Sequence, residues 1–192
     1  VVTVPLGVLK SGYIQFCPPL SDQHQSAITD LEIGERLQVA LDFPHDFWGV
    51  KSQFIGALTE APSFPLYVNH QAIHGVPRLT AIAGDGFART MQSAHDNEVV
   101  EAALHLLRTL FGDCPAPSRS SVSRWMSDPW SLGGTSGIPV GKSTLIRNQL
   151  ADWSGRVLFA GEATSFEHPG TIEGAMNSGL HAAQKVSAKV HP

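Results

Sequence analysis

One segment near the carboxyl end constrains the fold more than any other. Residues 155–164 read Gly-Arg-Val-Leu-Phe-Ala-Gly-Glu-Ala-Thr, and His168-Pro169-Gly170-Thr171 follow shortly afterwards. The apolar run 156–161 predicts a buried strand, and Glu162 comes directly after it, in a tight turn. The small residues beyond Thr171 predict a helix that runs to Val190. A strand that feeds a helix through a short turn is typical of folds that combine sheet and helix.

The start of this helix is also a candidate binding surface. Free N–H groups and a partial positive charge at a helix start can hold a phosphate, or the negatively charged N1–C2=O edge of a reduced flavin. Gly170, Gly174 and Ala175 would let a planar ring approach the backbone closely. From chemistry alone, ordinary packing of a strand on a helix explains the segment equally well.

Short strands and helices alternate along the rest of the chain. Apolar alternation and turn residues predict strands at 1–4, 37–43, 53–58, 66–69, 79–83 and 121–125. Helical spacing predicts helices at 21–31 and 97–111, the second ending at Gly112, and residues 6–9 are expected to form a short turn. The β-branched run Val1–Val4 resembles a buried strand that needs neighbours on both sides. We therefore expect this chain to be a fragment.

Composition excludes several classes of protein. The formal net charge is −4, 16% of the residues are charged, and no run of Lys and Arg occurs that could bind a nucleic acid. No apolar run approaches the roughly 18–20 residues of a membrane span. Cys17 and Cys114 lie far apart without CxxC spacing, which fits reduced thiols, although a single disulfide stays open. These features are typical of a cytoplasmic protein.

Three short motifs look functional but do not satisfy the rules of their classes. Residues 136–144 nearly match a phosphate-binding loop, but Ser136 replaces the first glycine and Pro139 lacks an N–H group. A nucleotide site in this loop stays as the weakest alternative. His70 and His74 have the spacing of a zinc pair without the adjacent Glu of the metalloprotease motif. Residues 84–89 lack the third glycine of a dinucleotide-binding fingerprint.

The carboxyl-terminal segment is similar to the signature of the flavin-containing amine oxidases. This family includes polyamine oxidases, monoamine oxidases and lysine-specific histone demethylases. Three further blocks agree in order and spacing, so the resemblance spans essentially the whole chain. They are Val1-Thr3-Val4-Pro5-Leu6-Gly7-Val8-Leu9-Lys10 with Phe16, Pro18-Pro19-Leu20 and Ala27-Ile28; Val39, Leu41, Phe43 and Phe47-Trp48; and Arg124-Trp125 with Asp128-Pro129-Trp130-Ser131.

The resemblance implies an α/β (α+β) fold and FAD as the cofactor. Residues 1–20 would be a returning segment of the FAD-binding domain, and residues 21–120 the later part of a mixed-sheet substrate-binding domain. Residues 121–192 would then close the FAD-binding domain. The GxGxxG segment that binds the ADP half of FAD would lie upstream, on the same protein or on a companion chain. The implied reaction oxidises a small amine and consumes dioxygen.

The resemblance also implies which residues form the site. Glu162 would hydrogen-bond the ribityl–pyrophosphate region, and the backbone of Thr171 and Ile172 would face the pyrimidine edge of the flavin. Trp125 and Trp130 match aromatic residues near the ring, although either could be plain core. The full set of expected cofactor-binding residues is Thr3, Val4, Pro5, Trp125, Trp130, Gly134, Thr135, Gly161, Glu162, Gly170, Thr171, Ile172 and Ala175.

The chain departs from the family pattern at the catalytic position. Many members carry a lysine that holds a water near flavin N5, and the matching residue here is Gln38, which has no charge. Many members also flank the amine with two aromatic side chains, where this chain has Thr135 and Thr171. Some demethylase-like members share the second threonine. These departures leave open an alternative function, a catalytically impaired flavin-fold module that serves as a scaffold or interaction surface.

Overall fold

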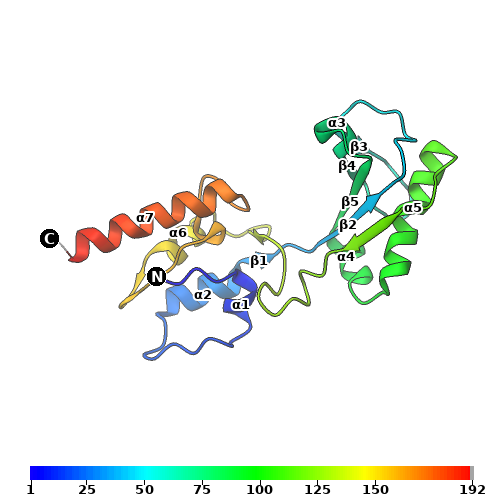
Figure 1. Ribbon diagram of the computed structural model, residues 1–192. Coiled ribbons are helices and arrows are strands. Elements are labelled where there is room, and N and C mark those ends of the chain that lie inside the picture. The colour runs from blue at the N-terminus through cyan, green and yellow to red at the C-terminus, as the bar shows by residue number, and fades with distance from the viewer. Residues whose placement is uncertain (191–192) are drawn as a thin grey trace. The chain divides into compact units, whose positions relative to one another are not determined.

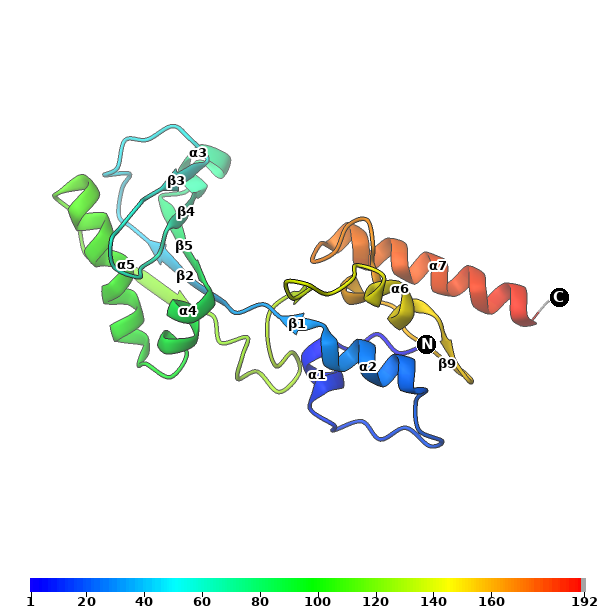
Figure 2. The ribbon, with the colours of Figure 1, turned by 180° about the vertical axis from the view of Figure 1, so that it is seen from behind.

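The computed structural model describes residues 1–190, which divide into two compact units. Unit 1 comprises Val1–Gly34 and residues 126–190, and unit 2 comprises Glu35–Trp125. Figures 1 and 2 show both units as mixtures of helix and strand. Unit 2 is therefore inserted between two segments of unit 1 that are far apart in the sequence.

Unit 2 is built on a five-stranded sheet with the strand order β3-β4-β5-β2-β6. All neighbouring strands are antiparallel, and Leu37 lies opposite Ala83 in the central β2–β5 pair. Side chains of β2 and β5 alternate strictly between buried and half-buried, because successive residues of a strand point to opposite faces. The five strands are β2 (Arg36–Asp42), β3 (Phe54–Gly56), β4 (Leu66–Asn69), β5 (Arg78–Gly84) and β6 (Arg119–Val122).

Helices complete the core of unit 2. α4 (Asp85–Met91) and α5 (Asp96–Phe111) contact the sheet, while the short helix α3 (His70–His74) follows β4 (Figure 1). α5 ends at Gly112, whose φ of 76° favours glycine, so this predicted helix end is confirmed. The buried face of α5 includes Leu107, whereas Leu110, near the end of the helix, is 42% exposed. One contiguous apolar core joins sheet and helices.

Unit 1 consists of short elements and one long helix at its carboxyl end. Its core joins Leu6 and Leu31 from the first segment with Ile146, Leu150 and Phe159 from the second. The elements are α1 (Leu6–Lys10), α2 (Asp22–Asp30), β1 (Glu32–Ile33), β7 (Ser136–Gly137), α6 (Ile146–Ala151), β8 (Trp153–Ser154), β9 (Val157–Leu158), a 3-10 turn η1 (Glu162–Thr164) and α7 (Ile172–Val190).

Several sequence-based expectations for unit 1 were wrong. Val1–Val4 is not a buried strand, since Val1 is 67% exposed and only Val2 forms a bridge, parallel to Phe159. Residues 6–9 form the helix α1 instead of a turn, because the Pro5 carbonyl accepts the amides of Val8 and Leu9. The strand expected at 156–161 is regular only in β9, where it pairs with β8.

The unit boundaries also differ from the predicted ones. Residues 21–34 belong to unit 1, because Ala27, Ile28 and Leu31 are buried in its core and α2 packs on α6. Residues 121–125 belong to unit 2, because β6 pairs with β2 as far as Val122. The assignment of the two units to FAD binding and substrate binding stays a prediction.

Candidate functional site

The Glu162 carboxylate joins three segments of unit 1. Its Oε1 accepts a hydrogen bond from the Ser136 backbone N–H at 2.9 Å. Its Oε2 accepts from the Ser136 hydroxyl and from the Gly170 N–H, both at 2.8 Å. A carboxylate has about four acceptor sites, so one site on Oε1 stays available for a further donor. The turn after β9 thus fixes both β7 and Gly170, two residues before α7 begins.

A buried arginine completes this arrangement. Arg147 on α6 is only 3% exposed, and its Nη1 donates to the Ser136 hydroxyl at 2.6 Å and to the Ala163 carbonyl at 3.1 Å. Its Nη2 donates to the Ser136 carbonyl at 3.2 Å. Burial lowers the pKa of the Arg147 guanidinium, and the negative charge of Glu162 opposes this shift. The positive and negative side chains are therefore bridged by one serine.

The first turn of α7 is capped and open to solvent. The Thr171 hydroxyl accepts from the Gly174 N–H at 3.0 Å and donates to the His168 carbonyl at 2.8 Å. Ile172 is 82% exposed, and the Ala175 N–H is bonded to the Thr171 carbonyl. Because the first amides of a helix have no acceptor within it, this end presents free donors and a partial positive charge.

Two glycines shape the backbone beside this helix start. Gly161 has φ 144° and donates its N–H to the Ser178 hydroxyl at 2.8 Å, and a Cβ there would meet open space. Gly170 has φ 71°, and its Cα faces the side chain of Thr135, which a Cβ would approach at 3.5 Å. The structure therefore brings Thr135, Gly170 and Thr171 together, as the resemblance implies.

The first segment of the chain lies against the same turn. The Val2 N–H donates to the Leu158 carbonyl at 2.8 Å, and the Ala160 N–H donates to the Val2 carbonyl at 3.0 Å. Thr3 and Pro5 are exposed beside this bridge, and Val4 is half-buried. A Cβ on Gly7 would lie 2.4 Å from the carbonyl oxygens of residues 131 and 132, so only glycine permits this contact.

The remaining expected residues are divided between the units. Gly134 and Trp130 belong to unit 1, where the Gly134 N–H donates to the Gly34 carbonyl at 3.0 Å. Trp130 is 82% exposed, which excludes plain core packing within residues 1–190. Trp125, 44% exposed, and Gln38 belong to unit 2.

Gln38 lies on the half-buried face of β2. Its backbone N–H donates to the Ser123 hydroxyl at 2.8 Å, and the Ser123 N–H donates to its carbonyl at 2.9 Å. When the amide oxygen of Gln38 faces Arg36, it accepts from Nε and Nη2 of that guanidinium, both at 3.1 Å. The uncharged side chain of Gln38 thus lies next to the guanidinium of Arg36, which is two residues earlier on the same face of β2.

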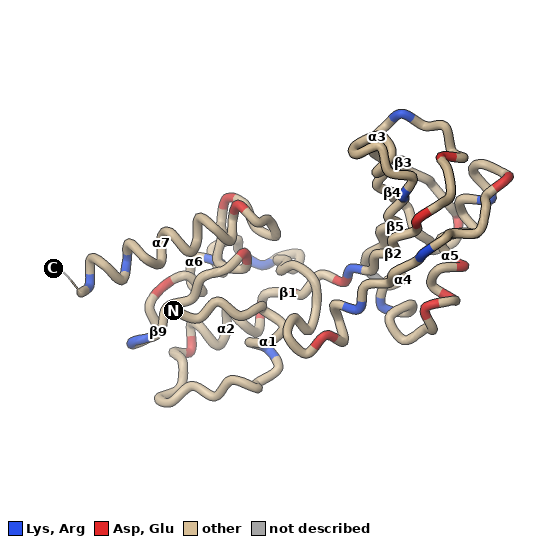
Figure 3. The backbone as a smooth tube through the Cα atoms, viewed as in Figure 1, with Lys and Arg blue, Asp and Glu red and all other residues tan. Residues whose placement is uncertain are grey.

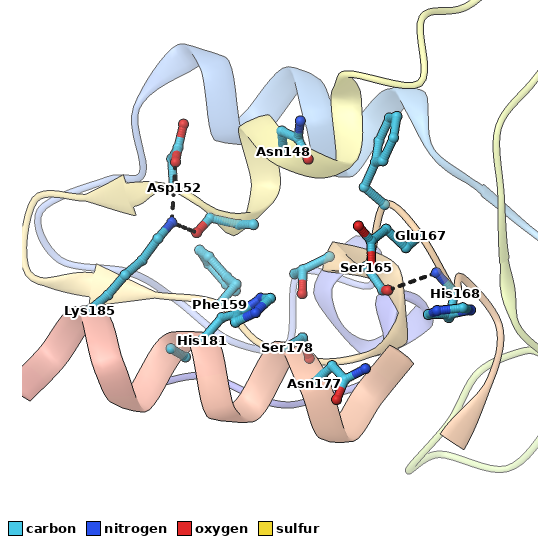
Figure 4. A pocket seen from close by; sticks show the side chains of 14 residues that line it. Asn148, Asp152, Phe159, Ser165, Glu167, His168, Asn177, Ser178, His181 and Lys185 are labelled. Atoms are coloured by element: carbon cyan, nitrogen blue, oxygen red, sulfur yellow. Dashed lines mark hydrogen bonds and ion pairs between the residues drawn. The ribbon is translucent and has the colours of Figure 1, made fainter. Parts of the chain in front are cut away.

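A pocket of about 680 Å³ lies between α6, α7 and the turn after β9 (Figure 4). Lys185 bonds the Ala151 carbonyl at 3.0 Å and lies 3.4 Å from Asp152 at one end, while the His168 N–H bonds the Ser165 hydroxyl at 3.2 Å at the other. None of the expected cofactor-binding residues lines this pocket. It is therefore lined by other residues than the ones joined by Glu162.

The motifs that the sequence rules disfavoured form no recognisable site. Lys142 pairs with Asp30 at 3.0 Å, so its ammonium serves a surface ion pair. The rings of His70 and His74 lie 5.9 Å apart, but residues 1–190 contain no cluster of three or more candidate metal ligands. Acidic and basic residues are interspersed along both units (Figure 3). Among the described helices, none is long and apolar enough to span a bilayer.

Comparison with known proteins agrees with the geometry. The sequence profile of the family described as flavin containing amine oxidoreductase matches residues 1–187. The chain belongs to this family. The structure is accordingly a mixed α/β part of the amine oxidase fold, and the family is a flavin-containing one, which implies FAD as the cofactor. Membership places the chain in the oxidoreductase class.

Plant and human relatives cover almost the whole chain. The chain is 37% identical over 194 residues to the lysine-specific histone demethylase 1 homolog 1 of Arabidopsis thaliana. This alignment covers 96% of the chain and 23% of the relative. It is 35% identical over 191 residues to polyamine oxidase 4 of Oryza sativa subsp. japonica, and this alignment covers 99% of the chain and 39% of the relative. It is 37% identical over 199 residues to the human lysine-specific histone demethylase 2, covering 97% and 24%. The chain spans about a quarter of the first relatives' own length.

The residues present fit a flavin. The open space at Gly161, the exposed start of α7 and the remaining acceptor site of Glu162 are on surfaces that a planar, hydrogen-bonding ligand can reach. Sequence reasoning missed Ser136 and Arg147 as members of the site. The sequence holds one signal for Arg147. It lies three residues before Leu150, and residues with this spacing share one face of a helix, so its charge is on the buried face of α6.

Proposed function

We propose that this chain is the carboxyl-terminal portion of an enzyme that oxidises a small amine with FAD. Bound FAD would supply the acceptor, at flavin N5, for a hydride from the carbon next to the amine nitrogen; dioxygen would take up the two electrons as hydrogen peroxide, and water would hydrolyse the imine. The observation that carries this proposal is the Glu162 carboxylate, which binds both Ser136 and Gly170, two residues before α7 begins.

The chain's own residues would contribute position and charge. The positive end of α7 would face the pyrimidine edge of the flavin, where negative charge develops on reduction, and its amides are oriented before any ligand arrives. Glu162 would offer its remaining acceptor site to a hydroxyl of the ribityl chain. Thr135 and Thr171 would line the ring without the aromatic faces that polarise an amine.

An upstream FAD-binding segment would be the immediate partner of this chain. On α7, Ile172, Met176 and Leu180 repeat at intervals of four residues and are 82%, 66% and 62% exposed. Such a stripe normally packs against another element. The share of the relatives' length that this chain spans supports a segment of the same protein as its cover.

The test uses the complete protein with its own upstream region. Purified protein should carry FAD, and peroxide should appear with at least one member of a panel of polyamines, monoamines, amino acids and histone peptides with methylated lysine. Polyamines and histone peptides are in the panel because relatives are named polyamine oxidase and lysine-specific histone demethylase. Colourless protein that takes up no FAD on titration would refute the proposal.

A second candidate is a flavin-fold module without oxidase activity, serving as a scaffold. It is favoured by Gln38, which lacks the charge of the lysine that it replaces, and by the threonine at position 135. This candidate predicts bound FAD together with no peroxide from any amine of the panel. Release of peroxide from even one amine, at a rate above that of free flavin, would exclude it.

A further inference from the structure

We propose that Arg147 is a positioning residue for the flavin site. The inference rests on the proposed function, because the site it would position is the one assigned there to FAD. Arg147 has no place in the sequence motifs and lies on α6, outside every segment expected to contact the cofactor. Its hydrogen bonds nevertheless reach the residues directly after two of those segments, Ser136 after Thr135 and Ala163 after Glu162.

The contacts form a continuous chain of hydrogen bonds. Arg147 holds Ser136 twice, through its hydroxyl at 2.6 Å and its carbonyl at 3.2 Å. Ser136 in turn donates both its hydroxyl and its N–H to Glu162. Glu162 then accepts the Gly170 N–H at 2.8 Å, one residue before the capping residue of α7.

The direct bond from Arg147 to the Ala163 carbonyl closes a second path. This bond, 3.1 Å from Nη1 to the carbonyl oxygen, fixes the 3-10 turn in which Glu162 lies. The loop of Gly134 and Thr135, the turn of Glu162 and the start of α7 are therefore all positioned from one guanidinium. A planar fork can hold two acceptors of one residue together with a third, which a single ammonium cannot do with the same geometry.

The burial of this charge argues for a positional role. A buried charge gains little net stability over an apolar side chain of similar size, because it loses its hydration. A methionine at this position would fill the same volume beside Ile146 and Leu150. An arginine that served only the core would therefore have no advantage, whereas one that sets the direction of Ser136 and Glu162 would.

The experiment compares variants of the complete protein with its upstream region. Arg147→Met removes the fork and keeps the volume, and Arg147→Lys keeps the charge. The matched control is Arg156→Met, since Arg156 is exposed in the β8–β9 turn of the same unit. Two quantities are measured: the FAD dissociation constant from quenching of flavin fluorescence, and amide hydrogen exchange of residues 168–175 in the FAD-free protein.

We expect Arg147→Met to weaken FAD binding about tenfold to a hundredfold, the range lost with a hydrogen bond to a charged group. Exchange at Gly170 should quicken, and the visible spectrum of any bound flavin should shift. Arg147→Lys should recover part of the affinity, and Arg156→Met should match the wild type in every measurement. An unchanged dissociation constant and unchanged exchange in Arg147→Met would overturn the proposal.

The remaining outcomes also decide. If Arg147→Met does not fold, wild-type affinity in Arg147→Lys overturns the role of the fork, and a loss supports it. Unfolding of both variants would make Arg147 a stability residue and overturn the positional role. If the wild type itself takes up no FAD, the proposed function fails, while the exchange of residues 168–175 still reports separately whether Arg147 orders that loop.

Discussion

Replacing Gly174 by alanine tests the contact that seats α7 on the preceding loop. A Cβ at this position would lie 1.9 Å from the His168 carbonyl oxygen and 2.9 Å from the Ser165 hydroxyl. Ordinary carbon–oxygen contacts begin near about 3.3 Å. The carbonyl is backbone and cannot swing away, so either α7 or residues 165–168 must move by about 1.4 Å, the difference between these two distances.

Two effects of opposite sign decide the result. Alanine in a helix interior is favoured over glycine by about 0.8–1 kcal/mol. Overpacking typically costs about 1–3 kcal/mol, with backbone shifts at the upper end. Because the obstacle is backbone, we expect the second effect to prevail, so Gly174→Ala should lower the free energy of unfolding by about 1–2 kcal/mol.

The control is Gly179→Ala, on the same helix. A Cβ at Gly179 would meet nothing within 4 Å, so only the gain in helix propensity applies, about 0.5–1 kcal/mol. Urea unfolding of residues 1–192, followed by circular dichroism at 222 nm, measures both variants. Equal stabilisation by the two substitutions would refute the reasoning, because it would mean that α7 does not press on the His168 carbonyl.

Three further expectations concern unit 2. The hydrogen bonds from Arg78 hold the pKa of the Asp42 carboxyl below its ordinary value of 3.8. The stability that this carboxylate contributes is therefore complete above pH 3.8 and is lost as the pH falls through the lower pKa of the folded state. Asp42→Asn should remove this loss and flatten the acid side of a plot of urea midpoint against pH. Gln38→Lys alone should lower the thermal unfolding midpoint, because the new ammonium would face the Arg36 guanidinium, and adding Arg36→Gln should restore the midpoint. An unaltered midpoint in the single variant would contradict the placement of Gln38 next to Arg36. Leu107→Ala, at a fully buried position, should cost about 2–5 kcal/mol in urea unfolding, and a loss below 1 kcal/mol would mean that α5 is not packed on the sheet.

The parts of the fold that sequence could predict are those with a local cause. β4 begins and ends as expected because Leu66–Asn69 combines apolar side chains with a flanking proline. The end of α5 follows from Gly112, because glycine has no Cβ and adopts a positive φ without steric cost. The helix α1 was not predictable, since five residues carry too little periodicity and Gly7 is selected by carbonyls more than a hundred positions away.

The candidate site divides in the same way. Glu162 and Gly170 were expected together because they lie eight residues apart in one motif. The participation of Ser136 depends on a contact across 26 residues, and that of Arg147 on burial of a residue that is usually exposed. The contact of Ser136 is not visible in the local pattern, and the spacing of Arg147 from Leu150 shows only that its charge lies on the buried face of α6. The different assignment of residues 21–34 has the same origin, since only tertiary packing of α2 on α6 shows to which unit they belong.

The short ladder between β1 and β7 has a consequence for how such a protein can change. Glu32 lies opposite Gly137 and Ile33 opposite Ser136, and the Gly34 N–H bonds the Thr135 carbonyl at 2.7 Å. This is the register of a hairpin in which unit 2 and residues 126–134 of unit 1 together occupy the position of the loop. A two-residue turn joining Gly34 to Thr135 would close the same ladder and keep Ser136 next to Glu162, but it would remove Trp130 and Gly134 of unit 1 together with unit 2.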